Sequence, residues 1–269
     1  MDISSTRTIR NSFNQAAQSY DRCDGVQRDV ARQLAELFPA RLTDSAKILE
    51  IGCGTGNLTE LLRERYPRNP LWVMDLAPAM VDSAQRRVEA RYGTGTETAW
   101  QAVDIRMFQP EVEFDLVASS SVLHWVKQLP ETIRQLAGWI APGGQMVCSV
   151  MTEGTLAELH EARRAVAPGK MAARHRLPQG KAVVSALLEA GLVVQAVVEQ
   201  KIQERMASSL ALFQMLGGLG VAAGFYGSDM ALNRTELERL MRKYDREYMA
   251  PGGGVTVTWC VQYLSSIKA

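Results

Sequence analysis

Three glycines at alternating positions follow a short apolar run near residue 50, in the sequence Ile48-Leu49-Glu50-Ile51-Gly52-Cys53-Gly54-Thr55-Gly56. This pattern is typical of a strand that turns sharply into a helix, where glycine lets the backbone come close to a ligand. The third glycine of the dinucleotide fingerprint would fall at Asn57, so the spacing departs from that fingerprint. Glu50 also places an acid on the strand that leads into the loop, which disfavours a pyrophosphate and favours a cationic small molecule.

S-adenosylmethionine meets these requirements, because it has an ammonium and a sulfonium group and no phosphate. Asp75 follows the apolar run Leu71–Met74, where an acidic residue meets ribose hydroxyls in doubly wound nucleotide sites. Asp104 lies where a third strand would end, and its carboxylate can accept a hydrogen bond from an adenine amine. A solvated loop aspartate is the alternative for Asp104. We therefore expect a cofactor site at the ends of these strands.

A fourth apolar run, over residues 114–118, leads into Ser119-Ser120-Ser121-Val122-Leu123-His124-Trp125. Ligands of open α/β sheets bind outside the carboxyl ends of the strands, so Ser120, His124 and Trp125 are candidates to face the reacting centre. Trp125 could instead pack in the core, and His124 could cap a helix or lie at the surface.

The elements that position these residues follow from the spacing of the apolar side chains. Helices are predicted over 24–38, 58–66, 79–88 and 131–140, and strands over 47–51, 71–74, 114–119 and 145–150. Because parallel neighbours need crossover connections, alternating strands and helices imply a parallel sheet with helices on both faces.

The pattern changes after residue 150. Thr155 with Glu158, and Thr235 with Glu238, have the spacing of capping boxes that begin helices. The uncharged segment 206–228 contains five glycines and is too interrupted for a membrane span, so we interpret it as a buried or lid helix followed by a glycine-rich loop. A further helix is expected over 181–190, and strands over 192–202 and 255–263.

The composition is that of a globular protein with a sizeable core: 269 residues, 46% hydrophobic and 22% charged. The net charge is +1, so no global field attracts nucleic acid or a membrane surface. The four cysteines form no C-x-x-C pair, which fits neither a structural zinc site nor a disulfide framework. We therefore expect no metal site. The polar N-terminus lacks the apolar region of a signal peptide, so we expect a cytoplasmic protein.

The glycine pattern, Asp75, Val103-Asp104-Ile105 and Pro142-Gly143-Gly144 together resemble the class I S-adenosylmethionine-dependent methyltransferases over residues 47–150. The resemblance implies an α/β fold, with a seven-stranded doubly wound Rossmann-like sheet, an antiparallel last strand and helical lid insertions. It also implies that Glu50 and the glycine loop hold the methionine end of the cofactor, Asp75 the ribose and Asp104 the adenine. The expected cofactor residues are Tyr20, Glu50, Gly52, Cys53, Gly54, Gly56, Asp75, Leu76, Met80, Asp104, Ile105 and Ser120.

Segments outside this core narrow the resemblance to the malonyl-acyl-carrier-protein O-methyltransferases of biotin synthesis. They include residues 12–21, Leu123-His124-Trp125, residues 154–160, Arg176-Leu177-Pro178 and Val257-Thr258-Trp259. The resemblance implies methyl transfer from S-adenosylmethionine to the free carboxylate of a malonyl group on acyl-carrier protein. It also implies a single domain over 1–269, with a helical lid over 1–40, a cofactor-binding core over 47–151, and insertions over 152–180 and 205–250 that cover the site.

A carboxylate acceptor determines what else the site needs. It is already ionised at pH 7, so no general base is required, and removal of water and alignment should supply most of the rate. Residues 161–181 carry six basic residues against Glu161 alone. We expect Arg174 or Arg176 to hold the malonyl carboxylate or contact the pantetheine path, beside His124 and Trp125. Arg163, Arg164 and Lys170 are expected to dock the acidic carrier protein, with a solvated charged face as the alternative.

Three other functions stay open on the sequence alone. A methyltransferase acting on a small-molecule carboxylate or a quinone precursor would share every cofactor residue. A nicotinamide oxidoreductase could use the same sheet, although the loop spacing and Glu50 oppose it. A non-catalytic module could keep the fold and bind a carrier protein or RNA, but the neutral charge and the lack of a basic stripe with interleaved aromatics disfavour RNA.

Overall fold

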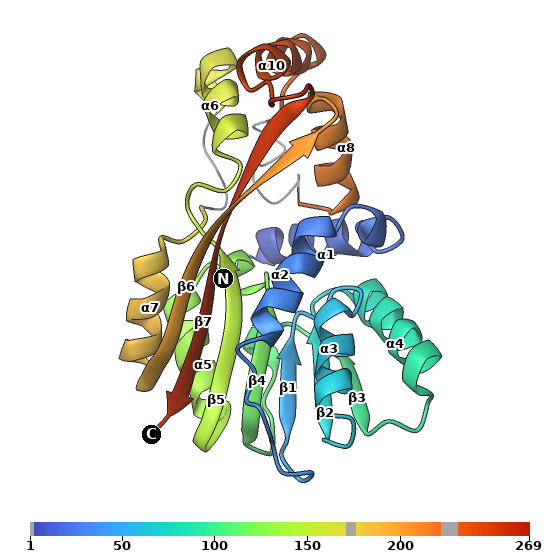
Figure 1. Cartoon of the computed structure of the whole chain (residues 1–269), viewed down its shortest axis with the longest axis vertical. Helices are drawn as coiled ribbons and strands as arrows, with labels where there is room; N and C mark the ends of the chain where they lie inside the picture. Colours follow the sequence, from blue (N-terminus) through green and yellow to red (C-terminus); the bar gives the residue numbers. More distant parts are fainter. Residues whose placement is uncertain (1–2, 171–175, 222–230) are drawn as a thin grey trace.

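The strands of the protein form one sheet in the computed structural model, which describes residues 3–170, 176–221 and 231–269 (Figure 1). They are β1 (Ile48–Ile51), β2 (Leu71–Asp75), β3 (Thr98–Ala102), β4 (Phe114–Ser120), β5 (Ile140–Met151), β6 (Leu192–Met206) and β7 (Val255–Lys268). Their order in the sheet is β3-β2-β1-β4-β5-β7-β6. All pairs from β3 to β5 are parallel, and β7 is antiparallel to both of its neighbours. The predicted doubly wound sheet with a reversed last strand is confirmed.

The four helices predicted before residue 150 are present, with ends shifted by a few residues. None of the described helices is both long and apolar enough to cross a bilayer. The α-helices are α1 (Ile3–Ala16), α2 (Gly25–Ala35), α3 (Asn57–Arg65), α4 (Pro78–Tyr92), α5 (Leu129–Trp139), α6 (Ala157–Val166), α7 (Gly180–Glu189), α8 (Ser209–Gly218) and α10 (Arg234–Glu247), and the 3-10 helices are η1 (Tyr20–Arg22), η2 (Ile105–Met107), η3 (Leu123–Trp125) and η4 (Pro168–Lys170).

The first predicted capping box is wrong. The Thr155 hydroxyl does not cap α6, because it donates to the carbonyl oxygen of Cys260 (3.1 Å) and accepts from the backbone N–H of the same residue (2.9 Å). The Glu158 carboxylate accepts from the backbone N–H of Thr258 at 3.2 Å. Both side chains are therefore used by β7, a tertiary contact that local spacing cannot reveal.

The second predicted capping box is wrong by two residues. Helix α10 begins after Asn233, whose side chain accepts from the backbone N–H of Glu236 at 2.9 Å. The Glu236 carboxylate completes the box by accepting from the Asn233 N–H at 2.8 Å. Asparagine and threonine both cap helices well, so the competing Thr235 box differed only in register.

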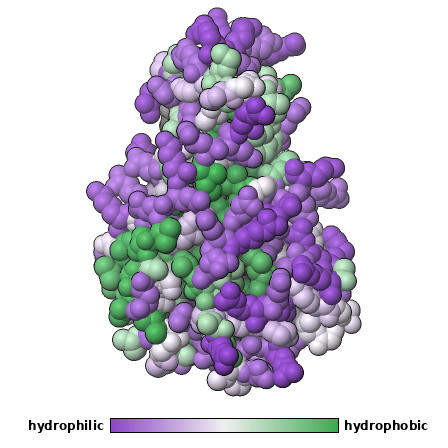
Figure 2. Space-filling model, viewed as in Figure 1, coloured by the Kyte–Doolittle hydropathy of each residue, from purple (hydrophilic) through white to green (hydrophobic). Residues whose placement is uncertain are grey.

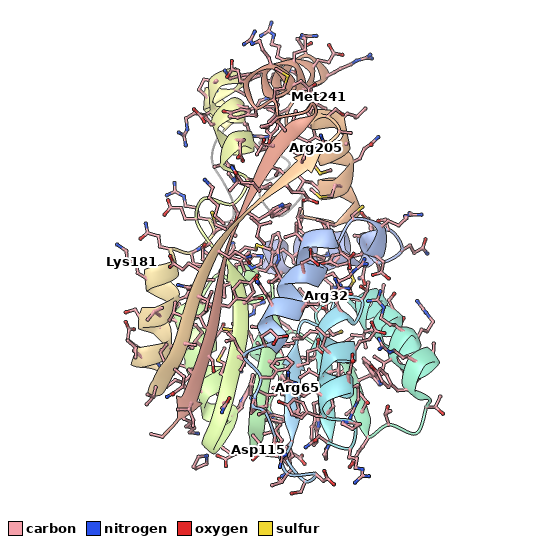
Figure 3. All side chains as sticks on the ribbon, in the orientation of Figure 1. Arg32, Arg65, Asp115, Lys181, Arg205 and Met241 are labelled. Carbon is pink, nitrogen blue, oxygen red and sulfur yellow. The ribbon has the colours of Figure 1, made fainter. Side chains whose placement is uncertain are left out.

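β6 and β7 continue beyond the predicted ends, to Met206 and Lys268. The end of β6 and the start of β7 project beyond the rest of the sheet. β5 pairs only with the second half of β7, so the first half of β7 pairs with β6 alone. The helices α6, α8 and α10 pack around these projecting strands and form an upper layer (Figure 1). Figure 3 shows Arg205 of β6 and Met241 of α10 in this layer and Asp115 of β4 at the opposite end of the molecule. The upper layer thus lies beyond the carboxyl ends of the parallel strands.

One edge of the sheet is apolar and exposed. Figure 2 shows hydrophobic residues gathered over α7 and the adjoining part of β6. Leu188, Val193, Val197 and Val198 are all exposed there. β6 is the terminal strand at this edge. None of these residues lines the cavity described below, so the apolar edge and the candidate site are separate surfaces.

Arg63 of α3 is almost completely buried although it is charged, with 1% of its surface exposed. Its Nη1 donates to the carbonyl oxygen of Asn69 at 2.7 Å, and its Nη2 donates to that of Glu97 at 2.7 Å and to Thr98 Oγ1 at 2.9 Å. The guanidinium therefore joins the segments that lead into β2 and β3.

Replacing Arg63 with alanine should lower the free energy of unfolding by about 3 kcal/mol, because it leaves buried carbonyl groups without donors and opens a cavity. Urea unfolding followed by circular dichroism measures this change. Arg65→Ala, an exposed position on the same helix, is the matched control and should cost about 1 kcal/mol or less. Equal losses in the two variants would contradict the structural role of Arg63.

Candidate functional site

A cavity of about 500 Å³ lies where the carboxyl ends of β1, β2, β3 and β4 face α1 and α2, within the roughly 300–1,000 Å³ typical of small-molecule sites. Most residues of the predicted site line it, although they come from distant parts of the chain. Glu50, on β1, and Gly56, which precedes α3, do not line it. The predicted residues in its wall are Tyr20, Gly52, Cys53, Gly54, Asp75, Leu76, Met80, Asp104, Ile105, Ser120, His124 and Trp125.

Glu50 is fully buried on β1, two residues before Gly52. Within the described part of the chain, neither of its carboxylate oxygens has a hydrogen-bond partner. Burial raises the pKa of Glu50 to about 8, although the polar side chain of Thr59 lowers this pKa by a smaller amount. A buried carboxylate of this kind is satisfied by a cation. This agrees with the sequence-based expectation of a cationic ligand.

The glycine loop is fixed to the end of β2. Gly52 and Gly54 have φ values of +71° and +53°, in the left-handed region that favours glycine. The Gly54 N–H donates to Asp75 Oδ2 at 3.0 Å, and the Ala77 N–H donates to Oδ1 at 2.8 Å. Burial raises the pKa of Asp75, against these backbone hydrogen bonds. Each carboxylate oxygen retains capacity for a further hydrogen bond, which suits ribose hydroxyls.

Arg106 is a site residue that sequence reasoning missed. Its backbone N–H and its Nε donate to Asp104 Oδ1 at 3.0 and 2.9 Å, and its Nη2 donates to Thr6 Oγ1 of α1 at 2.8 Å. Burial alone would raise the pKa of Asp104, but the hydrogen bonds and charge of Arg106 outweigh it and lower that pKa. The predicted adenine residue is therefore ionised and joined to α1.

The segment that contains Tyr20 is held against the glycine loop by charged and polar side chains. Asp21 accepts from the Thr55 hydroxyl at 2.5 Å and from Arg87 Nη2 at 2.8 Å. Asn57 donates through Nδ2 to Asp24 Oδ2 at 2.6 Å. Burial, followed by nearby carboxylates, raises the pKa of Tyr20, so its hydroxyl stays protonated. η1 and the start of α2 thus close one side of the cavity.

His124 and Trp125 also lie in the wall, on η3. The backbone N–H of Met151 donates to His124 Nδ1 at 3.3 Å, so in the neutral imidazole the proton is on Nε2. The Trp125 ring makes an edge contact with Phe13 of α1, with ring centroids 5.6 Å apart. Trp125 therefore both packs against α1 and borders the cavity.

The predicted acceptor and docking cations are not gathered at the cavity. Arg176 is exposed and does not line it, and Arg174 lies outside the described residues. The docking prediction for Arg163 is wrong, because this side chain is buried and its Nε donates to the carbonyl oxygen of Lys170 at 3.2 Å. The ammonium of Lys170 is paired with Glu236 at 2.6 Å. Of the three docking residues, Arg164 alone is exposed.

A family model described as "Methyltransferase domain" matches residues 24–197. Solved structures share the fold, among them magnesium protoporphyrin IX methyltransferase from Synechocystis PCC 6803. That structure has a TM-score of 0.63 and 14% identity, covering 98% of this chain and all of that one. The chain therefore belongs to the class I S-adenosylmethionine-dependent methyltransferases.

Two curated relatives refine this assignment. A protein from Halorhodospira halophila is 30% identical, over 96% of this chain and 86% of its own length. A protein from Paenibacillus sp. is 36% identical, but the match spans 57% of this chain and 58% of that relative. Both are named malonyl-[acyl-carrier protein] O-methyltransferase. Within its class, the chain belongs to the family that carries this name.

Proposed function

We propose that this enzyme transfers a methyl group from S-adenosylmethionine to the free carboxylate of a malonyl thioester on acyl-carrier protein. The observation that carries the proposal is the match to the Halorhodospira relative over 96% of this chain. The product would be a methyl ester whose neutral end suits the biotin route implied by the sequence resemblance.

The cavity fits the cofactor on observations independent of the family. Glu50 does not line the cavity, but its buried, unpartnered carboxylate lies two residues before the wall residue Gly52 and would attract the ammonium group. The positive φ angles of the glycine loop let its backbone lie close to the methionine end. Asp75 would accept from the ribose hydroxyls, and Asp104 from the adenine amine. Tyr20, on the segment closed by Asp21 and Arg87, would cover the bound molecule.

The chain's own residues have to align and desolvate the acceptor. When bound, S-adenosylmethionine would supply an electrophilic methyl carbon for the acceptor carboxylate, and its sulfur would keep the electron pair of the carbon–sulfur bond. No proton moves, because the acceptor is ionised at neutral pH. α1, which contacts Trp125 through Phe13, would limit the access of water to the cavity and so strengthen electrostatic interactions inside it. His124 and Trp125 would border the acceptor.

Transfer of labelled methyl groups tests this function. The enzyme is incubated with methyl-labelled S-adenosylmethionine and, separately, with malonyl-carrier protein, acetyl-carrier protein, malonyl-coenzyme A or free malonate. We expect label on the malonyl-carrier protein, released by mild alkali as expected of a methyl ester, and none on the acetyl form. Label on free malonate alone would instead support the second candidate, a methyltransferase for small carboxylates.

Docking of the carrier protein belongs to the same proposal. Of the predicted docking side chains, Arg164 of α6 presents its charge to solvent and can attract an acidic partner. The charge of Lys170 is offset by Glu236. We therefore assign docking of the carrier protein to the surface of the upper layer around Arg164.

A further inference from the structure

Two polar side chains in the cavity wall have no role in the cofactor assignment. Gln27 of α2 and Ser121, which follows β4, both line the cavity. Among the described residues, Gln27 Oε1 and Ser121 Oγ are buried without a hydrogen-bond partner. Buried polar atoms of folded proteins nearly always have partners. Two such atoms in one cavity wall indicate that a polar group of a ligand completes them.

Ser121 is held in a conformation that supports this interpretation. Its φ is 57°, in the left-handed backbone region that residues other than Gly, Asn and Asp rarely adopt. Its backbone N–H donates to the carbonyl oxygen and to the hydroxyl of Ser149, both at 3.1 Å. These bonds hold the backbone while the hydroxyl lies in the cavity wall. Strained backbone of this kind is concentrated at ligand and active sites.

The turn of α2 that carries Gln27 is tied to the segment before the helix. Arg28 Nη2 donates to the carbonyl oxygen of Asp21 at 3.1 Å and also pairs with Asp24. These contacts fix the first turn of the helix, and Ala31, one turn later, lines the same cavity. Rotation about the last bond of the amide lets Gln27 present either its N–H or its C=O to a ligand. It can therefore donate to an anionic group.

We propose that Gln27 and Ser121, the acceptor pair, bind the acceptor carboxylate through uncharged N–H and O–H donors. This inference rests on the proposed carboxylate methylation. Uncharged donors orient a carboxylate while leaving it the negative charge that makes its oxygen nucleophilic, whereas a bidentate arginine offsets that charge in a strong ion pair. Hydrogen bonds to a charged acceptor are stronger than those to a neutral one, so the methyl ester product binds the acceptor pair less tightly and leaves.

Two variants test the acceptor pair without disturbing the backbone. Gln27→Leu removes the amide C=O and NH2 at similar volume. Ser121→Gly removes the hydroxyl, and glycine adopts the positive φ without strain. We expect each to raise KM for malonyl-carrier protein about tenfold, the effect of losing a hydrogen bond to a charged group. The Kd of S-adenosylhomocysteine should change by less than about twofold. Gln33→Leu is the matched control, since this side chain is exposed on the same helix as Gln27 and does not line the cavity.

A binding measurement separates recognition from turnover. With S-adenosylhomocysteine bound, the wild type should bind malonyl-pantetheine more tightly than acetyl-pantetheine, which lacks the carboxylate, and both variants should lose this preference. Unchanged KM in both variants, or a rise in the Kd of S-adenosylhomocysteine as large as the rise in KM, overturns the inference. If the wild type methylates no malonyl thioester, the proposed function fails together with it. If the wild type methylates the malonyl thioester and both variants have the same KM as the wild type, only the inference about the acceptor pair fails.

Discussion

Replacing Glu50 with glutamine should weaken binding of S-adenosylhomocysteine by about 100-fold or more, the usual cost of removing one partner of a buried charge pair. The Glu50 carboxylate has no hydrogen-bond partner among the described residues, and under the proposed function the ammonium of the ligand would satisfy it. Glutamine has nearly the same volume but cannot ionise. Isothermal titration calorimetry measures the change. Glu64→Gln, an exposed position on α3, is the control and should bind like the wild type.

The same variant should be more stable than the wild type at alkaline pH when no ligand is present. The pKa of Glu50 is about 8 in the folded protein and 4.5 ordinarily, so between these values the folded state holds a proton that the unfolded state has lost. Stability from this group is complete below pH 4.5 and is lost as pH rises through about 8. Glutamine removes this loss. Thermal unfolding from pH 6 to about 9 should show a smaller decline in Tm for Glu50→Gln.

Replacing Gly52 with alanine should abolish measurable cofactor binding and lower stability. A Cβ at this position would lie 2.2 Å from Cγ2 and 2.6 Å from Cγ1 of Val122, and φ is +71°. Val122 is β-branched and stiff, so the loop that leads to η3 must shift. Together the overlap and the backbone strain should cost about 3 kcal/mol. Differential scanning fluorimetry with and without S-adenosylhomocysteine reports both effects.

Two comparisons identify the cause of the Gly52→Ala effect. Gly54→Ala also places alanine at a positive φ, but nothing lies within 4 Å of the added Cβ in the protein. Its free energy of unfolding should therefore fall by strain alone, about 1 kcal/mol. Adding Val122→Ala to Gly52→Ala should restore part of the stability, since it removes the two closest atoms. A Gly52→Ala protein as stable as Gly54→Ala would contradict the overlap.

The gathering of Gly52, Asp75 and Ser120 at one cavity could be predicted because they lie at the carboxyl ends of strands. Gly52 comes after β1, Asp75 ends β2 and Ser120 ends β4, and the carboxyl ends of parallel strands meet at one edge of a sheet. Strand order and direction therefore bring these residues together without any knowledge of side-chain contacts. The glycine spacing then distinguishes the loop from a dinucleotide-binding one.

The remaining parts depend on tertiary contacts that have no local pattern. Arg163 has the sequence context of a solvated basic segment, yet it is buried in the upper layer, where its guanidinium bonds to the backbone at Lys170. The last residues of β6, 203–206, pair with β7 beyond β5, and residues 264–267 of β7 pair with both β5 and β6. Gln27 and Ser121 line the cavity on backbone segments that are tied by contacts of Arg28 and Ser149 with residues distant from any local motif. Such positions are set by the assembled fold.

Proton release on ligand binding tests most directly whether the buried carboxylate of Glu50 receives the cation of the cofactor. Calorimetric titration of S-adenosylhomocysteine at pH 7, in buffers with different ionisation enthalpies, measures it. The free protein holds a proton on Glu50 because its pKa is about 8, and pairing with the ammonium must expel that proton. We expect release of about one proton per ligand, which Glu50→Gln abolishes together with tight binding. Tight binding without proton release, unchanged in Glu50→Gln, would contradict this account of the site.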